Sequence, residues 1–316
     1  MLQRFRNHMI WLAPVLAVLV FIALPNEFTD ADGKTAVLGL AGRATGALTV
    51  WMALWWLTEA IDLSATALLP LVVLPILGQV SIKTVAAPYA HDLIFLFMGG
   101  FLISLSMERW DLHKRIALFT ISLFGQKPSR VVAGFMTATA FLSMWLSNTA
   151  TTLMLLPIAI SILPFFKEEK TEKPYESFAL CLLLGVAYSA SVGGIATIIG
   201  TPPNALLISF LRDQLKQDIS FTTWMSYALP LSVTFLVLMW FLLTRFLFSL
   251  KSTQFIGSSD EIQRMRRDLG GWSNGERWTA FVFFLAVTLW ITRPLLMKMH
   301  LFGGLPFKGL SDAGIG

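Results

Sequence analysis

The residues with the clearest potential for chemistry lie in two uncharged stretches, each interrupted by small polar residues. One contains Ser147-Asn148-Thr149-Ala150-Thr151-Thr152, and the other contains Gly200-Thr201-Pro202-Pro203-Asn204. Hydroxyl groups, amide oxygens and the carbonyl groups freed where a membrane helix breaks are oxygen ligands that suit Na⁺. A helix that restarts after such a break also presents unpaired N–H groups, which attract carboxylates. The pattern therefore indicates a combined cation and anion site.

The first stretch, residues 131–166, cannot form one ordinary membrane span. As a single helix its 36 residues would be about 54 Å long, whereas a hydrocarbon core is about 30 Å thick. Its midpoint falls at Asn148, and basic residues flank both of its ends. We therefore expect a re-entrant helical hairpin over residues 128–166, which enters and leaves the membrane on one side.

The second stretch, residues 177–211, is also too long for one span. The consecutive residues Pro202 and Pro203 cannot lie inside a helix but suit its first turn. We expect a broken helix with a loop over roughly residues 191–201 and with Thr201 as the N-cap of its second half. Neither stretch contains Asp, Glu, Lys, Arg or His, which proton relays inside membranes normally use. The expected coupling ion is therefore Na⁺ rather than H⁺.

The composition places these stretches in an all-α polytopic membrane protein. The chain has 316 residues, of which 55% are hydrophobic and 14% are charged, and its formal net charge is +5. An ordinary soluble domain carries roughly 25% charged residues. Further apolar helices are expected at residues 9–24, 36–57, 63–82, 93–107, 219–244 and from residue 279 onward.

The sequence argues against several enzyme and pump classes. Cys181 is the only cysteine and suits a packing role, and the four histidines form no HExxH motif, so no hydrolytic metal centre is expected. No GxxxxGK[ST] phosphate loop occurs. A membrane enzyme with Ser147 or Thr201 as nucleophile would need a base, and both stretches lack one. We expect a protein that is not an enzyme and that uses no cofactor.

The charge pattern predicts the orientation in the membrane. Arg4 and Arg6 precede the first apolar segment, whereas Glu27, Asp30 and Asp32 follow it. By the positive-inside rule the N-terminus is expected in the cytoplasm. The basic excess lies in short loops, which indicates topology rather than nucleic-acid binding. We expect a multi-pass protein of the cell (inner) membrane, embedded in the lipid bilayer.

Several charged residues are expected to mark element boundaries. Glu59, Asp62 and Asp92 suit caps or first turns of helices more than buried functional roles. Residues 108–127 mix basic and apolar side chains, as in a helix that lies in the membrane interface. Residues 251–278 are polar and suit a cytoplasmic linker, and Arg293-Pro294 suits a membrane boundary.

Two motifs together resemble one known family. The sequence Ser143-Met144-Trp145-Leu146-Ser147-Asn148-Thr149-Ala150-Thr151 is similar to the first Ser-Asn-Thr motif of the divalent anion:sodium symporter family, which carries dicarboxylates, citrate and sulfate. The sequence Ile199-Gly200-Thr201-Pro202-Pro203-Asn204 resembles the loop of the first broken helix of that family. The stretch from Trp55 to Ile61 is also similar, and the whole chain fits the order of the family's N-terminal half.

The resemblance implies a site and a mechanism. A sodium site would comprise Ser143, Ser147, Asn148 and the carbonyl group of Gly200. The substrate, a small dianion such as a C4-dicarboxylate, would contact Asn148, Thr149, Thr201 and Pro202. The family works as a homodimer in which a transport domain moves like an elevator against a scaffold. The implied division is scaffold helices at 1–107, an interfacial helix at 108–127, transport-domain elements at 128–213, a membrane helix at 214–250, a linker at 251–278 and the start of a second repeat at 279–316.

The resemblance covers only the first of the two inverted repeats. The chain contains a single Ser-Asn-Thr motif, so we expect either a fragment or a truncated protein, the fragment being favoured. Two other readings stay open: a sodium-independent exchanger of dicarboxylate, tartrate or citrate, and a non-transporting membrane subunit. The identity of the anion does not follow from the sequence.

Overall fold

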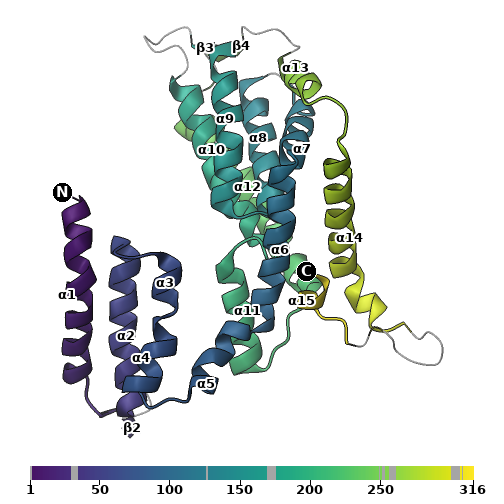
Figure 1. Cartoon of the computed structure of the whole chain (residues 1–316). Helices are drawn as coiled ribbons and strands as arrows, with labels where there is room; N and C mark the ends of the chain where they lie inside the picture. Colours follow the sequence, from purple (N-terminus) through teal and green to yellow (C-terminus); the bar gives the residue numbers. More distant parts are fainter. Residues whose placement is uncertain are drawn as a thin grey trace. The chain divides into compact units, whose positions relative to one another are not determined.

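The computed structural model describes residues 2–29, 35–125, 127–168, 176–248, 250, 253–255, 261–299, 307 and 309–316. The chain divides into two compact units, Met1–His91 and Asp92–Gly316. Each unit consists mainly of helices (Figure 1).

The first unit is built on an antiparallel pair of long helices. Its elements are α1 (Leu2–Ala23), β1 (Glu27–Thr29), β2 (Thr35–Val37), α2 (Gly39–Thr58), α3 (Leu63–Ala67), α4 (Leu69–Leu77), α5 (Ile82–Ala86) and the 3₁₀ helix η1 (Ala87–Ala90). The indole Nε1 of Trp55 on α2 donates to the Met9 carbonyl on α1 over 3.0 Å. Arg43 closes the other end through two bonds to the Phe21 carbonyl.

The helix expected at residues 63–82 is shorter and interrupted. It forms α3 and α4 with a break at Leu68, and Pro70 and Pro75 remove two backbone donors that a continuous helix would use. Asp62 is the N-cap of α3 and accepts a bond from the Ser64 N–H over 2.8 Å, which confirms the expected cap. That bond lowers the pKa of the exposed Asp62 carboxyl.

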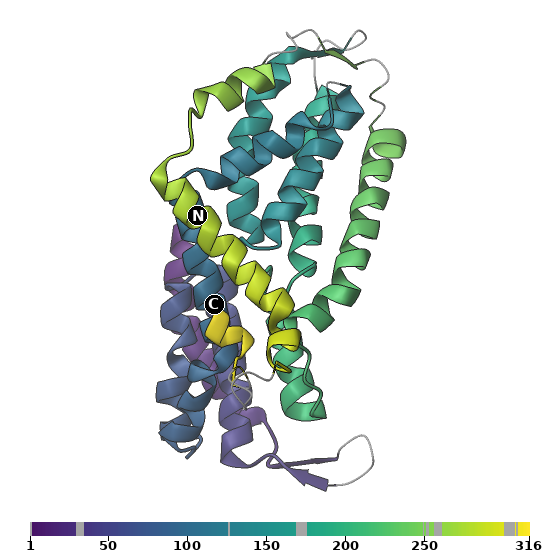
Figure 2. The ribbon, with the colours of Figure 1, turned by 90° about the vertical axis from the view of Figure 1, so that its right-hand side faces the viewer.

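The second unit contains the two polar interruptions. Its elements are α6 (Asp92–Arg109), α7 (Leu112–Ser122), α8 (Pro128–Ser143), α9 (Asn148–Ile162), η2 (Leu163–Phe165), β3 (Phe166–Glu168), α10 (Glu176–Ile195), α11 (Pro202–Leu215), α12 (Phe221–Phe241), the π-helical turn η3 (Leu242–Leu247), β4 (Thr253–Phe255), α13 (Glu261–Asp268), α14 (Asn274–Leu296) and α15 (Asp312–Ile315). Figure 2 shows the long α14 crossing the front of this unit.

An aromatic stack in the core fixes the end of α8. Trp145, two residues after α8, lies nearly parallel to Trp290 of α14, with ring centroids 6.4 Å apart. Phe221, at the start of α12, stacks on Trp290 at 5.1 Å. All three rings are buried, so apolar burial anchors the first polar interruption to two other helices. Cys181 is fully buried, as expected for a packing residue.

The fold is that of a helical multi-pass membrane protein. Among the described residues, six helical segments are long and apolar enough to span a bilayer: Phe5–Ala23, Ile82–Arg109, Asn148–Phe165, Glu176–Ile195, Phe221–Leu247 and Asn274–Leu296. The helical class is confirmed. Two antiparallel pairs of three-residue strands, β1 with β2 and β3 with β4, were not expected from the sequence.

Two element boundaries differ from the expectation. Helix α10 continues through residues 191–195, so the break is confined to residues 196–201. Helix α14 begins inside the expected linker, because Ser273 and Glu276 form a reciprocal capping box. It then runs past Arg293 and includes Pro294 near its end. The polar segment before it contains the short helix α13.

Candidate functional site

The first interruption joins α8 to α9. Helix α8 ends at Ser143, and Asn148 is the first residue of α9. The hydroxyl of Ser147 accepts a bond from the Ala150 N–H over 3.2 Å and so caps α9. The connection places Asn148 at a helix N-terminus, the position at which the sequence analysis expected a new helix to begin.

A second hydroxyl draws the two sides of this interruption together. The Ser143 Oγ lies 2.7 Å from the Asn148 Oδ1 and 2.7 Å from the carbonyl oxygen of Ala190 on α10. A hydroxyl carries one proton and can donate only one of these bonds at a time. The Ser143 hydroxyl is therefore one donor facing two acceptors, the Asn148 Oδ1 and the Ala190 carbonyl oxygen.

The second interruption joins α10 to α11. Thr201 occupies the N-cap position of α11 in extended geometry, but its side chain makes no capping bond. The first two helical residues, Pro202 and Pro203, have no N–H group, and the Asn204 N–H bonds to the Thr201 carbonyl over 3.1 Å. The expectation of unpaired N–H groups at this end was therefore wrong for residues 202–204, although the helix dipole remains.

The Asn204 side chain holds the connection in place. Its Nδ2 donates to the carbonyl of Gly194 over 2.8 Å and to that of Thr197 over 2.7 Å. Asn204 is buried, so these bonds satisfy an amide group that would otherwise be costly to bury. The bonds connect the end of α10 and the loop after it to the start of α11.

Thr197 connects the two interruptions. Its hydroxyl donates to the Met144 carbonyl, directly after α8, and accepts from the Gly200 N–H over 3.0 Å. Thr197 is fully buried. The sequence analysis did not select Thr197 or the side chain of Asn204. Asn204 was visible only as part of the Gly-Thr-Pro-Pro-Asn motif.

Three glycines allow the interruptions to approach. A Cβ atom at Gly194 would collide with the Asn148 Oδ1, and one at Gly193 would collide with the Ala140 carbonyl. A Cβ at Gly200 would lie 2.5 Å from the Gly194 carbonyl oxygen. Backbone atoms block a side chain at Gly193 and Gly200, and a side chain at Gly194 would have to displace the Asn148 amide. Helix α10 and the loop after it therefore pack directly on α8 and α9.

The structure brings some of the expected site residues together and leaves others apart. Ser143, Ser147 and Asn148 share the first interruption, and Gly200 lies beside Gly194, which contacts Asn148. Thr149 and Pro202 are exposed and Thr201 is half-buried. No direct bond between Thr149 and Thr201 occurs among the described residues.

Two further hydroxyl groups in these stretches were not among the residues assigned to the site. Thr151 on α9 and Ser189 on α10 are fully buried, and neither side-chain oxygen has a hydrogen-bond partner within the described residues. Thr151 follows Asn148 by three positions, and Ser189 precedes Ala190. Unpaired buried oxygens are costly unless an ion or water satisfies them, so these two hydroxyl groups have free capacity to bind one.

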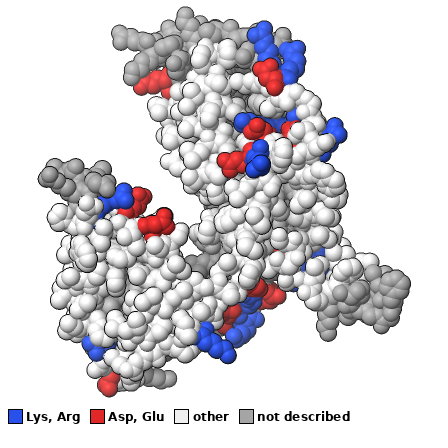
Figure 3. All heavy atoms as spheres, viewed as in Figure 1, with Lys and Arg blue, Asp and Glu red and all other residues white. Residues whose placement is uncertain are grey.

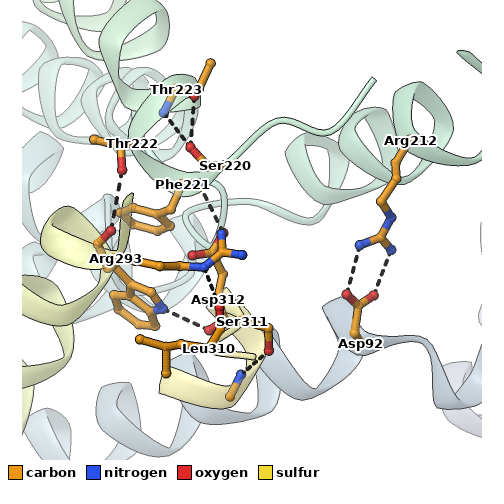
Figure 4. A network of polar contacts seen from close by, with 12 residues as sticks. Asp92, Arg212, Ser220, Phe221, Thr222, Thr223, Arg293, Leu310, Ser311 and Asp312 are labelled. Atoms are coloured by element: carbon orange, nitrogen blue, oxygen red, sulfur yellow. Dashed lines mark hydrogen bonds and ion pairs between the residues drawn. The ribbon is translucent and has the colours of Figure 1, made fainter. Parts of the chain in front are cut away.

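Charged side chains lie in a separate network (Figure 4). Arg212, at the end of α11, forms two bonds of 2.7 and 2.8 Å with Asp92 at the start of α6, and these bonds raise the pKa of the guanidinium. Asp312 accepts from Arg293 over 3.1 Å and from the Phe221 N–H over 3.2 Å through Oδ2. Burial raises the pKa of the Asp312 carboxyl, and these partners offset that effect only in part.

Paired helix interruptions inside a helical membrane fold are the pattern typical of secondary transporters. A family model described as citrate transporter matches residues 53–313, and the chain belongs to this family.

Two curated relatives are similar over most of this chain. It is 37% identical over 292 residues to the sodium-dependent dicarboxylate transporter SdcS of Staphylococcus saprophyticus, covering 91% of this chain and 54% of the relative. It is 38% identical over 256 residues to SdcS of Staphylococcus aureus strain NCTC 8325, covering 80% and 49%. The chain thus spans about half the length of the curated relatives it matches.

Proposed function

We propose that this chain forms half of a secondary active transporter that couples Na⁺ to the uptake of a divalent organic anion such as a C4-dicarboxylate. The observation that carries the proposal is the oxygen cluster of Ser143 and Asn148, which is packed through Gly194 against the second helix interruption. The similarity to relatives named sodium-dependent dicarboxylate transporters supports the choice of ion and substrate.

In this proposal the two interruptions together bind Na⁺ and the substrate. Ser143, Ser147, Asn148 and the Gly200 carbonyl bind Na⁺, and the buried, unpaired oxygens of Thr151 and Ser189 are further candidate ligands. The N-terminus of α9, together with Asn148 and Thr149, receives one substrate carboxylate. Thr201 and Pro202 line the opposite side. The two prolines leave the start of α11 without N–H donors for the anion. Bound Na⁺ supplies the missing positive charge, so the dianion binds only after Na⁺.

The wider mechanism belongs to the same proposal. Helices α8 and α9 form a hairpin that opens from the cytoplasmic side, and the N-terminus is cytoplasmic. The hairpin and the pair α10 and α11 move as one transport domain against a scaffold of the early helices, in a homodimer. The partner half of the site comes from the region that the relatives have beyond the matched segment.

The test is uptake of labelled succinate into proteoliposomes with an inward gradient of Na⁺ or of K⁺. The chain is compared with a version extended to the next stop codon. Uptake by the extended version with Na⁺ alone supports the proposal. Equal uptake in both ions contradicts Na⁺ coupling and favours an exchanger, which a preloaded internal dicarboxylate would accelerate. Absence of uptake in either version contradicts the choice of substrate.

A further inference from the structure

A cationic groove lies between α7 and α13, and none of its residues belongs to either helix interruption. Its volume is about 620 Å³, and it is lined by Arg115, Ile116, Phe119, Arg266, Arg267, Leu269 and Trp272. We propose that this groove binds the phosphate-bearing headgroup of an anionic phospholipid.

Arg115 has a structural role in the groove, because its charge is paired within the protein. Its Nε donates to Glu276 over 2.8 Å, and its terminal nitrogens donate to the carbonyls of Leu269, Gly270 and Gly271 over 3.2 to 3.4 Å. Glu276 is buried and neutralises the guanidinium. Arg115 therefore fastens the segment after α13 to α7 and fixes the spacing of the two walls.

The free positive charge comes from Arg266 and Arg267. Both are exposed. Arg266 lies over the Phe119 ring, with the guanidinium carbon 5.6 Å from the ring centroid, and donates to Ser122 over 3.3 Å. The Arg267 side chain has no hydrogen-bond or ion-pair partner in the part of the chain that the structure describes. Two guanidinium groups at one groove match the planar, two-pronged recognition of phosphate oxygens.

The apolar lining favours a lipid over free phosphate. Phe119 is 51% exposed and Trp272 is 47% exposed, and Ile116 and Leu269 complete the floor. Free phosphate gains nothing from four apolar side chains, whereas a lipid covers them with its glycerol and acyl carbons. On the face in Figure 3, charged atoms of the second unit gather near α7 and α13 and again toward its opposite end, with an uncharged surface between them. The groove thus lies where headgroups meet an uncharged band.

The experiment is native mass spectrometry of the full chain, purified in detergent, with added phosphatidylglycerol, phosphatidylcholine or inorganic phosphate. Phosphatidylglycerol should remain bound in preference to phosphatidylcholine, and inorganic phosphate should not displace it at equal concentration. One arginine near an anionic lipid surface is worth roughly a fivefold factor in affinity at low salt. Arg267→Gln should weaken phosphatidylglycerol binding by about that factor, and Arg266→Gln with Arg267→Gln by about 25-fold.

Arg264→Gln is the matched control, because Arg264 lies on the same helix but does not line the groove. It should leave binding unchanged, and Arg267→Gln should unfold at the wild-type temperature. Equal retention of the two lipids, wild-type binding by the double variant, or the same loss in Arg264→Gln would overturn the proposal. Binding of inorganic phosphate without retention of either lipid would also overturn it, because it assigns the groove to a soluble anion.

Discussion

Gly194 on α10 lies so close to Asn148 on α9 that a Cβ atom at position 194 would collide with the Asn148 Oδ1, and the amide would have to move. This contact places the carbonyl-rich end of α10 beside the N-terminus of α9. The relationship explains why a glycine pair sits inside an otherwise regular helix, and it is the simplest feature of the site to test by substitution.

Gly194→Ala should destabilise the protein. The added methyl group must displace Asn148 or separate α10 from α9, and overpacking of this kind costs about 1–3 kcal/mol. Thermal unfolding in detergent would show the loss as a lower Tm. Gly271→Ala is the control, because a Cβ there meets no atom within 4 Å and the backbone is not left-handed. Equal unfolding temperatures for the two variants would show that the close contact is absent.

Thr197→Val should loosen the connection between the two interruptions. Valine keeps the shape of threonine but removes the hydroxyl, leaving the Met144 carbonyl and the Gly200 N–H without their partner. Groups left unpaired in a buried place cost about 1–3 kcal/mol. Thr197→Ser retains the hydroxyl and should recover most of the stability in a denaturation series. If the serine variant is no more stable than the valine variant, the hydroxyl is not the connecting group.

The Asp92–Arg212 pair should contribute only modestly to stability. The two side chains are 49% and 30% exposed, and exposed ion pairs are typically worth about 0.2–1 kcal/mol even with good geometry. A double-mutant cycle with Asp92→Asn and Arg212→Gln should give a coupling energy in that range, which decreases as salt is added. A coupling well above 1 kcal/mol would show that the pair is more enclosed than the structure describes.

The pH dependence of stability should report on Asp312. Burial raises the pKa of its carboxyl above the ordinary 3.8, so the folded state binds the proton more tightly than the unfolded state. The contribution of this group to stability is therefore greatest below pH 3.8 and falls as pH rises through the raised folded pKa. Asp312→Asn removes this titration. The difference in Tm, wild type minus variant, should decline between about pH 3 and pH 7. A rising difference would mean that pairing with Arg293 outweighs burial.

The sequence predicted the places of both interruptions because they depend on local chemistry. Ser147 and Asn148 interrupt an uncharged run, and the Pro202-Pro203 pair can only start a helix. The expectation of a loop over residues 191–195 was wrong. It depended on small and flexible residues, which are typical of loops. Tertiary packing against Ala140 and Asn148 retains them in α10 instead.

The connecting residues could not be predicted in this way. Thr197 bonds to a carbonyl 53 positions earlier in the chain, and Arg115 pairs with Glu276 across 161 positions. Nothing in the local sequence of either pair indicates its partner. The one local signal was an asparagine two residues after the expected helix start at Pro202. Its amide, which the structure shows to be buried, could have been expected to bind the preceding loop.

The central claim is that the two interruptions form one Na⁺-dependent anion site, and cysteine protection tests it most directly. The buried Cys181 is first replaced by alanine. Thr149→Cys then places an exposed thiol at the site, and Ser161→Cys places a control thiol on the same helix about 18 Å away. The extended version of the chain is used in membranes.

We predict that Na⁺ with succinate slows maleimide labelling at position 149 but not at position 161, and that K⁺ with succinate slows neither. Labelling at position 149 that is equally fast in all conditions, or equally protected in K⁺, would contradict the account.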